Sequence, residues 1–154
     1  MSNGINLKNK LLKKIVIAVF VLLVAAAGFA WFAFNSTHSD TSTTTAIYKM
    51  TALDFIKEFQ QNDSLANKKY AEKIIAVTGV VTEIEMADST VNIKLADTTT
   101  GSYAIFAFQQ QHLAEAKTIK EGDKVTIKGS CSGGTYSQIL ETEYIVFKRC
   151  ALSK

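Results

Sequence analysis

The stretch Ile74–Met86, IIAVTGVVTEIEM, decides the fold. Its apolar residues alternate through Ile75, Val77 and Val81, and a period of two is typical of a β-strand with one buried face. At 13 residues the stretch is long for a single strand. Gly79 stands in its middle, where a glycine indicates a bulge or a sharp bend. We therefore expect a long, bent first strand.

Four further strands are expected downstream of this stretch. Val91, Ile93 and Leu95 alternate with polar residues, which again indicates a half-buried strand. Turn-forming residues separate the remaining apolar runs. The expected elements are strands over residues 91–95, 102–108, 125–129 and 138–147, a helix over residues 110–119 with Leu113 and Ala116 facing the core, and a flexible Gly/Ser loop over residues 130–135.

Two short helices are expected upstream. The first is expected to start at Thr51, which with Asp54 three residues later resembles a capping box. Helical spacing places four apolar residues on or beside its core face: Leu53, Phe55, Ile56 and Phe59. The second helix is expected over residues 64–72, with Leu65 and Tyr70 buried.

This order of elements indicates the fold class. A long bent first strand, with a helix between the third and fourth strands, is the layout of an OB-fold barrel. We expect an all-β core with added helices: a five-stranded OB-fold barrel over residues 50–154, preceded by one or two short helices. Closure of the barrel would bury the sheet edges that five short strands otherwise expose.

An apolar segment at Ile15–Phe34 predicts a single transmembrane helix. It carries no charge and only Gly28 lies outside the apolar set, and 20 helical residues span roughly 30 Å, the thickness of a hydrocarbon core. Four lysines lie within residues 1–14, which predicts a cytoplasmic basic tip and a C-terminal domain across the cytoplasmic membrane. Residues 35–49 follow as a Ser/Thr-rich tether.

A cleaved signal peptide is the alternative to a retained anchor. Ala25–Ala27 offers a small-residue cleavage site. Cleavage there would leave an apolar stretch at the new N-terminus, and the apolar run is longer than a usual signal-peptide core. These two features favour a retained anchor.

Two runs of sequence resemble a known family. Asn67–Tyr70 with Lys73–Val81 (KIIAVTGVV), and Gly122–Gly133 (GDKVTIKGSCSG), are similar to the tRNA-anti-like family of OB-fold proteins. The resemblance covers about residues 50–150 and implies the OB fold, often with an N-terminal membrane or lipoprotein signal. It implies no mechanism, and Gln138-Ile139 replaces an Asp-Val pair that the family pattern leads us to expect.

The charge distribution excludes a uniformly basic nucleic-acid-binding body. The chain carries +3 overall, and the four N-terminal lysines account for +4. The remaining chain holds 13 basic against 14 acidic residues, a net charge of −1. The sequence pI therefore reflects the N-terminal tip and not the folded domain.

Few residues point to catalysis or metal binding. His112 is expected to be a solvated helix residue, and the presence of a histidine alone does not make a catalytic base. We expect no enzyme, no metal and no cofactor. Cys131 and Cys150 can form a disulfide, which an extracytoplasmic domain would permit, or remain two separate thiols. The pairs Glu83/Glu85 and Glu141/Glu143 each share a strand face, which more often is simply solvated.

Two functions remain open for the OB face. OB domains bind ligands on the second and third strands and on the adjoining loops. The exposed candidates there are Asn92, Lys94, Tyr103 and Tyr136. The first hypothesis is a non-enzymatic, membrane-anchored extracytoplasmic module that engages an envelope protein, peptide or glycan. The alternative is single-stranded nucleic-acid binding on the same face, against which the net charge of −1 and the expected location both count.

Overall fold

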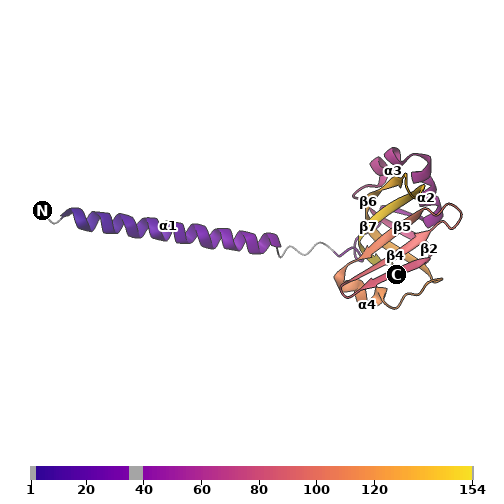
Figure 1. The fold of residues 1–154 in the computed structure, drawn as a ribbon. Helices are drawn as coiled ribbons and strands as arrows, with labels where there is room; N and C mark the ends of the chain where they lie inside the picture. The colour runs from indigo at the N-terminus through magenta and orange to yellow at the C-terminus, as the bar shows by residue number, and fades with distance from the viewer. Residues whose placement is uncertain (1–2, 35–39, 154) are drawn as a thin grey trace. The chain divides into compact units, whose positions relative to one another are not determined.

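The structure is a computed structural model that describes residues 3–34 and 40–153 of the chain. It divides into two compact units, residues 1–39 and 40–154 (Figure 1). The part of the expected tether at residues 35–39 lies outside the described residues.

The first unit is the helix α1 (Asn3–Phe34), which ends where the apolar segment was expected to end. Its window Leu12–Phe29 has a mean hydropathy of 2.3, and the helix is long and apolar enough to cross a membrane. The side chains of residues 12–29 are exposed within the unit.

The second unit is built on one seven-stranded sheet with the order β1-β2-β6-β7-β5-β4-β3. Strands β1 and β2 are parallel, as are β5 and β7, and the other neighbours are antiparallel. Its elements are β1 (Tyr48–Thr51), α2 (Ala52–Gln61), α3 (Asp63–Tyr70), β2 (Ile74–Val80), β3 (Glu83–Ala87), β4 (Thr90–Ala96), β5 (Tyr103–Phe108), η1 (Gln110–His112), α4 (Leu113–Ala116), β6 (Lys124–Ser137) and β7 (Thr142–Leu152).

This arrangement confirms the OB-like fold and corrects its strand count. The expected first strand is divided into β2 and β3, and β1 is added beside β2, so the sheet has seven strands where five were expected. The hydrogen-bonded ladder ends at β1 and β3 and does not close on itself. A partly open barrel is characteristic of the OB fold.

The break in the first strand falls at Val81 and Thr82, two residues after Gly79. There the Val81 amide donates to the Asp123 carbonyl and the Thr82 amide to the Lys94 carbonyl, so the chain changes neighbours. Gly79 was expected at a bend, but it lies where the backbone approaches α2: a Cβ on it would lie 2.9 Å from the Cβ of Ala52. The glycine lets α2 approach β2 closely.

The predicted Gly/Ser loop at residues 130–135 is part of the long strand β6. Small polar residues carry no periodicity and therefore predict a loop, but the hydrogen-bonded ladder with β7 holds them in a strand. The register shifts between Lys128 and Ser130 and again between Cys131 and Gly133, as in a β-bulge. The turn falls at residues 138–141, so the last strand begins at Thr142 and not at 138.

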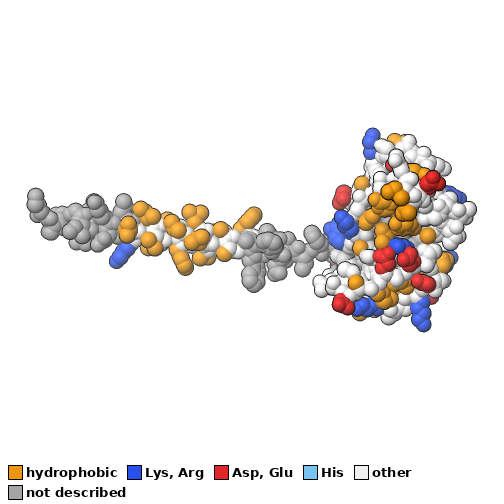
Figure 2. All heavy atoms as spheres, viewed as in Figure 1, with side chains coloured by type: hydrophobic (Ala, Val, Ile, Leu, Met, Phe, Trp, Pro, Cys, Tyr) orange, Lys and Arg blue, Asp and Glu red, His pale blue; other side chains and the backbone are white. Residues whose placement is uncertain are grey.

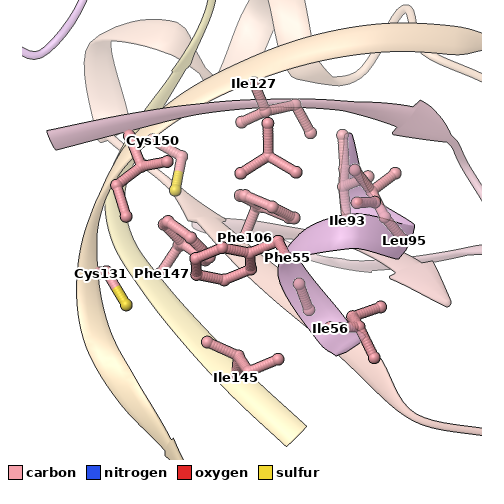
Figure 3. Close-up of a cluster of buried hydrophobic side chains, with 14 of the residues drawn as sticks. Phe55, Ile56, Ile93, Leu95, Phe106, Ile127, Cys131, Ile145, Phe147 and Cys150 are labelled. Atoms are coloured by element: carbon pink, nitrogen blue, oxygen red, sulfur yellow. The ribbon is translucent and has the colours of Figure 1, made fainter. Parts of the chain in front are cut away.

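The core forms where α2 packs on the sheet (Figure 3). Phe55 is fully buried, and its ring centroid lies 5.1 Å from those of Phe59 and Tyr70 and 5.4 Å from that of Phe147. The predicted cap is confirmed, since Thr51 Oγ1 accepts from the Asp54 amide at 3.2 Å. These contacts fix α2 over one end of the sheet.

Two residues predicted to be buried are exposed. Leu53 is 49% exposed, because the buried face of α2 is centred on Phe55, Ile56 and Phe59. Leu65 is 62% exposed, because α3 turns Ala66 and Tyr70 toward the core.

The cysteine pair does not form the disulfide considered from the sequence. Cys131 and Cys150 are free, buried thiols. The register places Cys131 opposite Phe147, and the side chains of the two cysteines lie apart in Figure 3. Burial raises the pKa of the Cys131 thiol to about 11, which keeps it protonated and unreactive.

The described part of the expected tether lies against the second unit. Thr41 is buried, and Lys128 Nζ donates to the carbonyls of Ser42 and Thr44, both at 2.7 Å. His112 Nε2 lies 2.8 Å from Asp40 Oδ1, and this hydrogen bond holds the pKa of that carboxyl well below its usual range. The compact unit therefore begins at Asp40, earlier than the boundary expected at residue 50.

Gly129 provides a test of this packing. A Cβ on it would lie 2.6 Å from Cys150 Sγ, so Gly129→Ala is expected to lower the free energy of unfolding by about 1–3 kcal/mol. Removing the sulfur with Cys150→Ala makes room for that methyl. The double variant is therefore expected to be more stable than the sum of the single effects by about 1 kcal/mol. Urea unfolding of the full chain in detergent, followed by circular dichroism, measures this coupling, and strictly additive effects would contradict the packing.

Candidate ligand-binding face

The outer face of β3, β4, β5 and β7 gathers three of the four predicted site residues. Along β4 the odd-numbered residues are buried, so Asn92 and Lys94 point outward. The register places Lys94 opposite Ile105 and Tyr103 opposite Ala96, which brings Tyr103 to the same face. The alternation of the sequence predicted that these residues are exposed, and the register of the strand pairing places them side by side.

Lys94 is held by two carboxylates on the neighbouring strand. Its Nζ lies 2.6 Å from Glu85 Oε1 and 3.2 Å from Glu83 Oε2. The hydrogen bond to Glu85 raises the pKa of Lys94, and the same bond lowers the pKa of Glu85. The Glu83/Glu85 pair therefore binds a lysine of its own sheet, and the three side chains together carry a net charge of −1.

A stacked pair of tyrosines lies beside this cluster. The rings of Tyr103 and Tyr144 have centroids 6.3 Å apart and an interplanar angle of 24°. Lys94 Nζ lies 5.4 Å from the centroid of the Tyr103 ring, which is within the range of a cation–π interaction. Sequence reasoning missed Tyr144, although alternation along β7 opposite the buried Ile145 could have indicated it.

Tyr136 lies apart from this group. It pairs with Glu143 in the register of β6 and β7, whereas Tyr144 pairs with Thr135. Successive pairs point to opposite sides of a sheet, so Tyr136 and Tyr144 do not share a face. Tyr136 is nevertheless 49% exposed, because it lies near the end of β6.

A hollow of about 330 Å³ adjoins Tyr144. Asn67 bridges to the backbone of Gly134 there, accepting from its amide at 2.9 Å and donating to its carbonyl at 2.8 Å. The hollow is lined by Asn67, Ser132, Gly133, Gly134, Thr135, Tyr144, Val146 and Lys148. Hydroxyl and backbone groups beside an aromatic ring suit a ligand with many hydrogen-bonding groups.

The described residues contain no group of three or more His, Cys, Asp or Glu side chains that could hold a metal ion. Figure 2 shows acidic and basic side chains intermingled with hydrophobic ones on the visible face of the domain. That face bears no uniform positive field.

The comparisons with known proteins place this geometry in a family. The tRNA-anti-like family matches residues 5–145. The chain belongs to this family. No curated protein matches the chain.

Among solved structures, a bacterial protein shares the fold of this chain, and two further structures are less similar. A crystal structure of a candidate nucleic acid-binding lipoprotein from Klebsiella pneumoniae is 20% identical, with a TM-score of 0.55 over 68% of this chain and 91% of that one. A lysozyme-binding OBody is 15% identical, with a TM-score of 0.42 over 55% of this chain and 84% of that one. A candidate aspartyl-tRNA synthetase from Leishmania major is 10% identical, with a TM-score of 0.43 over 77% and 22%.

Glu143 is a buried carboxyl behind the candidate face, and its protonation offers a pH test. It is 5% exposed, and its Oε2 has no hydrogen-bond partner among the residues that the structure describes. Burial, aided by the charge of Asp63, raises the pKa of Glu143. A raised carboxyl pKa means that the folded state binds its proton more tightly, so stability falls as pH rises above the ordinary value of 4.5.

Glu143→Gln removes this charge and is expected to raise the midpoint of thermal unfolding at neutral pH. The advantage should vanish below pH 4.5, where both states of the wild type are protonated. Glu121→Gln, at an exposed turn, is the matched control and should show no such crossover. Equal pH profiles for the two variants would contradict the assignment.

Proposed function

We propose that this chain is a non-enzymatic, membrane-anchored binding module whose OB face engages a glycan, peptide or protein of the cell envelope. The observation that carries the proposal is the position of Lys94 between Glu83 and Glu85. A lysine already paired with two carboxylates offers little net attraction to a phosphate backbone.

The electrostatics of the face favour an uncharged ligand. Nucleic-acid affinity comes largely from lysines and arginines that neutralise phosphates. The cluster around Lys94 is net negative, and residues 35–154 carry −1 in total. Lys148 adds a cation at the edge of the hollow, but one charge makes only a weak electrostatic footprint.

The remaining groups suit a glycan first. OB domains bind oligosaccharides as well as oligonucleotides on this face. The Tyr103–Tyr144 pair offers ring surfaces for the apolar side of a sugar. The carboxylates, Asn92 and the hydroxyls of the hollow offer partners for its hydroxyl groups.

The apolar helix and the lysines before it support an extracytoplasmic location for the domain. α1 is long enough to span the membrane, and the lysines of residues 1–14 favour the cytoplasmic side for the N-terminus. The Klebsiella pneumoniae neighbour is a lipoprotein, which agrees with membrane association.

Single-stranded nucleic acid is the second candidate. The same neighbour is described as a candidate nucleic acid-binding protein, and stacked tyrosines also suit bases. For this candidate, the phosphates of the ligand would have to bind near Lys94 despite repulsion by the carboxylates of Glu83 and Glu85.

A binding titration distinguishes the two candidates. The full chain in detergent is titrated with peptidoglycan glycan fragments, envelope peptides and a single-stranded oligonucleotide at low and high salt. We expect a neutral ligand to bind with little salt dependence, and Tyr144→Ala to weaken it about fivefold or more because the ring stack is lost. Tyr136→Ala is the matched control, since it removes a tyrosine that lies off this face.

Substitution of the two carboxylates beside Lys94 tests the second candidate. Glu83→Gln with Glu85→Gln frees Lys94 and is expected to raise the affinity for the oligonucleotide while leaving that for a neutral ligand nearly unchanged. Oligonucleotide binding by the wild type that falls steeply with salt, without binding of any neutral ligand, would replace the first proposal by the second.

The location is tested separately by protease treatment of cells stripped of any outer barrier. An extracytoplasmic domain should be digested while an N-terminal tag stays protected inside. A domain that resists protease until the membrane is broken would invert the topology. Loss of the N-terminal tag from the mature protein would instead indicate a cleaved signal peptide.

A further inference from the structure

Two apolar features of the second unit lie outside the proposed ligand face. The first is the hairpin tip, residues 138–141, which joins β6 to β7. The second is the α2 cleft, a hollow of about 450 Å³ where the start of α2 meets the ends of β2 and β4.

The hairpin tip presents apolar side chains in a turn, where polar residues are usual. Ile139 is 94% exposed and Leu140 is 63% exposed. The turn is defined by its own backbone contacts: the Leu140 amide donates to Ser137 Oγ at 3.3 Å, and Glu141 adopts a positive φ of 54°. A fixed turn that exposes two large aliphatic side chains favours burial against another surface.

The α2 cleft offers such a surface. Its apolar walls include Leu53 and Val80, which are 49% and 52% exposed, and Leu95 and Ala96 from β4. Its volume falls in the range of sites that hold a ligand. Lys124 lies at its rim and forms no ion pair with the residues that the structure describes.

Charge and position match the tip to the cleft. Glu141 follows Leu140 directly and, among the described residues, also has no ion-pair partner. We propose that the hairpin tip of one copy of this chain docks in the α2 cleft of a second copy, with Glu141 beside Lys124. This inference stands apart from the ligand face and does not depend on the proposed function.

The two features border the same turn of the fold, residues 97–102. Residues 97–99 line the cleft, and Ser102 Oγ accepts from the Glu143 amide at 3.1 Å, next to the tip. The tip and the cleft therefore both lie close to this turn. Two copies related by a two-fold axis can exchange tips, so each tip fills the other copy's cleft and the assembly closes as a dimer.

Cysteine trapping tests the contact directly in membranes. Full-length Ile139→Cys and Val80→Cys variants, each with its own tag, are co-expressed and treated with a mild oxidant. Placing one cysteine on each copy makes any new disulfide intermolecular. We expect a cross-linked heterodimer, and a much lower yield from the control pair Leu65→Cys with Val80→Cys, because Leu65, at 62%, is as exposed as Leu140 of the tip but lies on α3.

A charge exchange tests the specificity of the contact. By sedimentation of the full chain in detergent, Lys124→Glu and Glu141→Lys are each expected to raise the dimer dissociation constant about fivefold, and the combined variant to restore it. Leu140→Ser should raise that constant about 30-fold, because two buried leucines are lost per dimer. Leu65→Ser is the matched control and should change it less than about twofold.

Three results would overturn the inference: equal trapping yields for the test and control pairs, no trapping of either pair, or a Leu140→Ser variant that associates like Leu65→Ser. Self-association through α1 alone would appear as dimerisation that none of these substitutions changes, and it would also contradict a tip-in-cleft dimer.

Discussion

The packing of α2 on the sheet is the interaction on which the second unit depends. Phe55 contacts Phe59 and Tyr70 from the helices and Phe147 from β7, so one ring joins elements far apart in the chain. The ladder of the sheet ends at β1 and β3 without closing, and α2 packs on the apolar side chains of this sheet. Gly79 permits this approach because it has no side chain to separate β2 from α2.

Burial of the inner face leaves the outer face to polar and aromatic residues. Because side chains alternate along each strand, the same register that buries Ile93 and Leu95 presents Lys94 outward. Its neighbours Glu83 and Glu85 then neutralise it, and this pairing is the reason why we propose an uncharged ligand for the face. The chain belongs to the tRNA-anti-like family, whose fold it shares. The net negative charge around Lys94 is our reason for proposing a ligand other than nucleic acid.

The beginning of the second unit also depends on tertiary contacts. Lys128 on β6 binds the carbonyls of Ser42 and Thr44, and His112 binds Asp40. A Ser/Thr-rich stretch has no apolar pattern and reads as a flexible tether. Its backbone carbonyls are nevertheless good acceptors, and an ammonium placed beside them is enough to hold the segment on the domain.

Local patterns in the sequence determined the C-terminal end of α1, the cap of α2, the alternation of β4, and three residues of the candidate face: Asn92, Lys94 and Tyr103. These features follow from the periodicity of neighbouring residues, which the chain carries wherever it folds. Tertiary structure alone decided that residues 130–135 form a strand, that Cys131 faces Phe147 and that Tyr144 joins Tyr103. Those outcomes depend on which distant strand pairs with which and in what register, and a one-residue shift would turn each side chain to the other face.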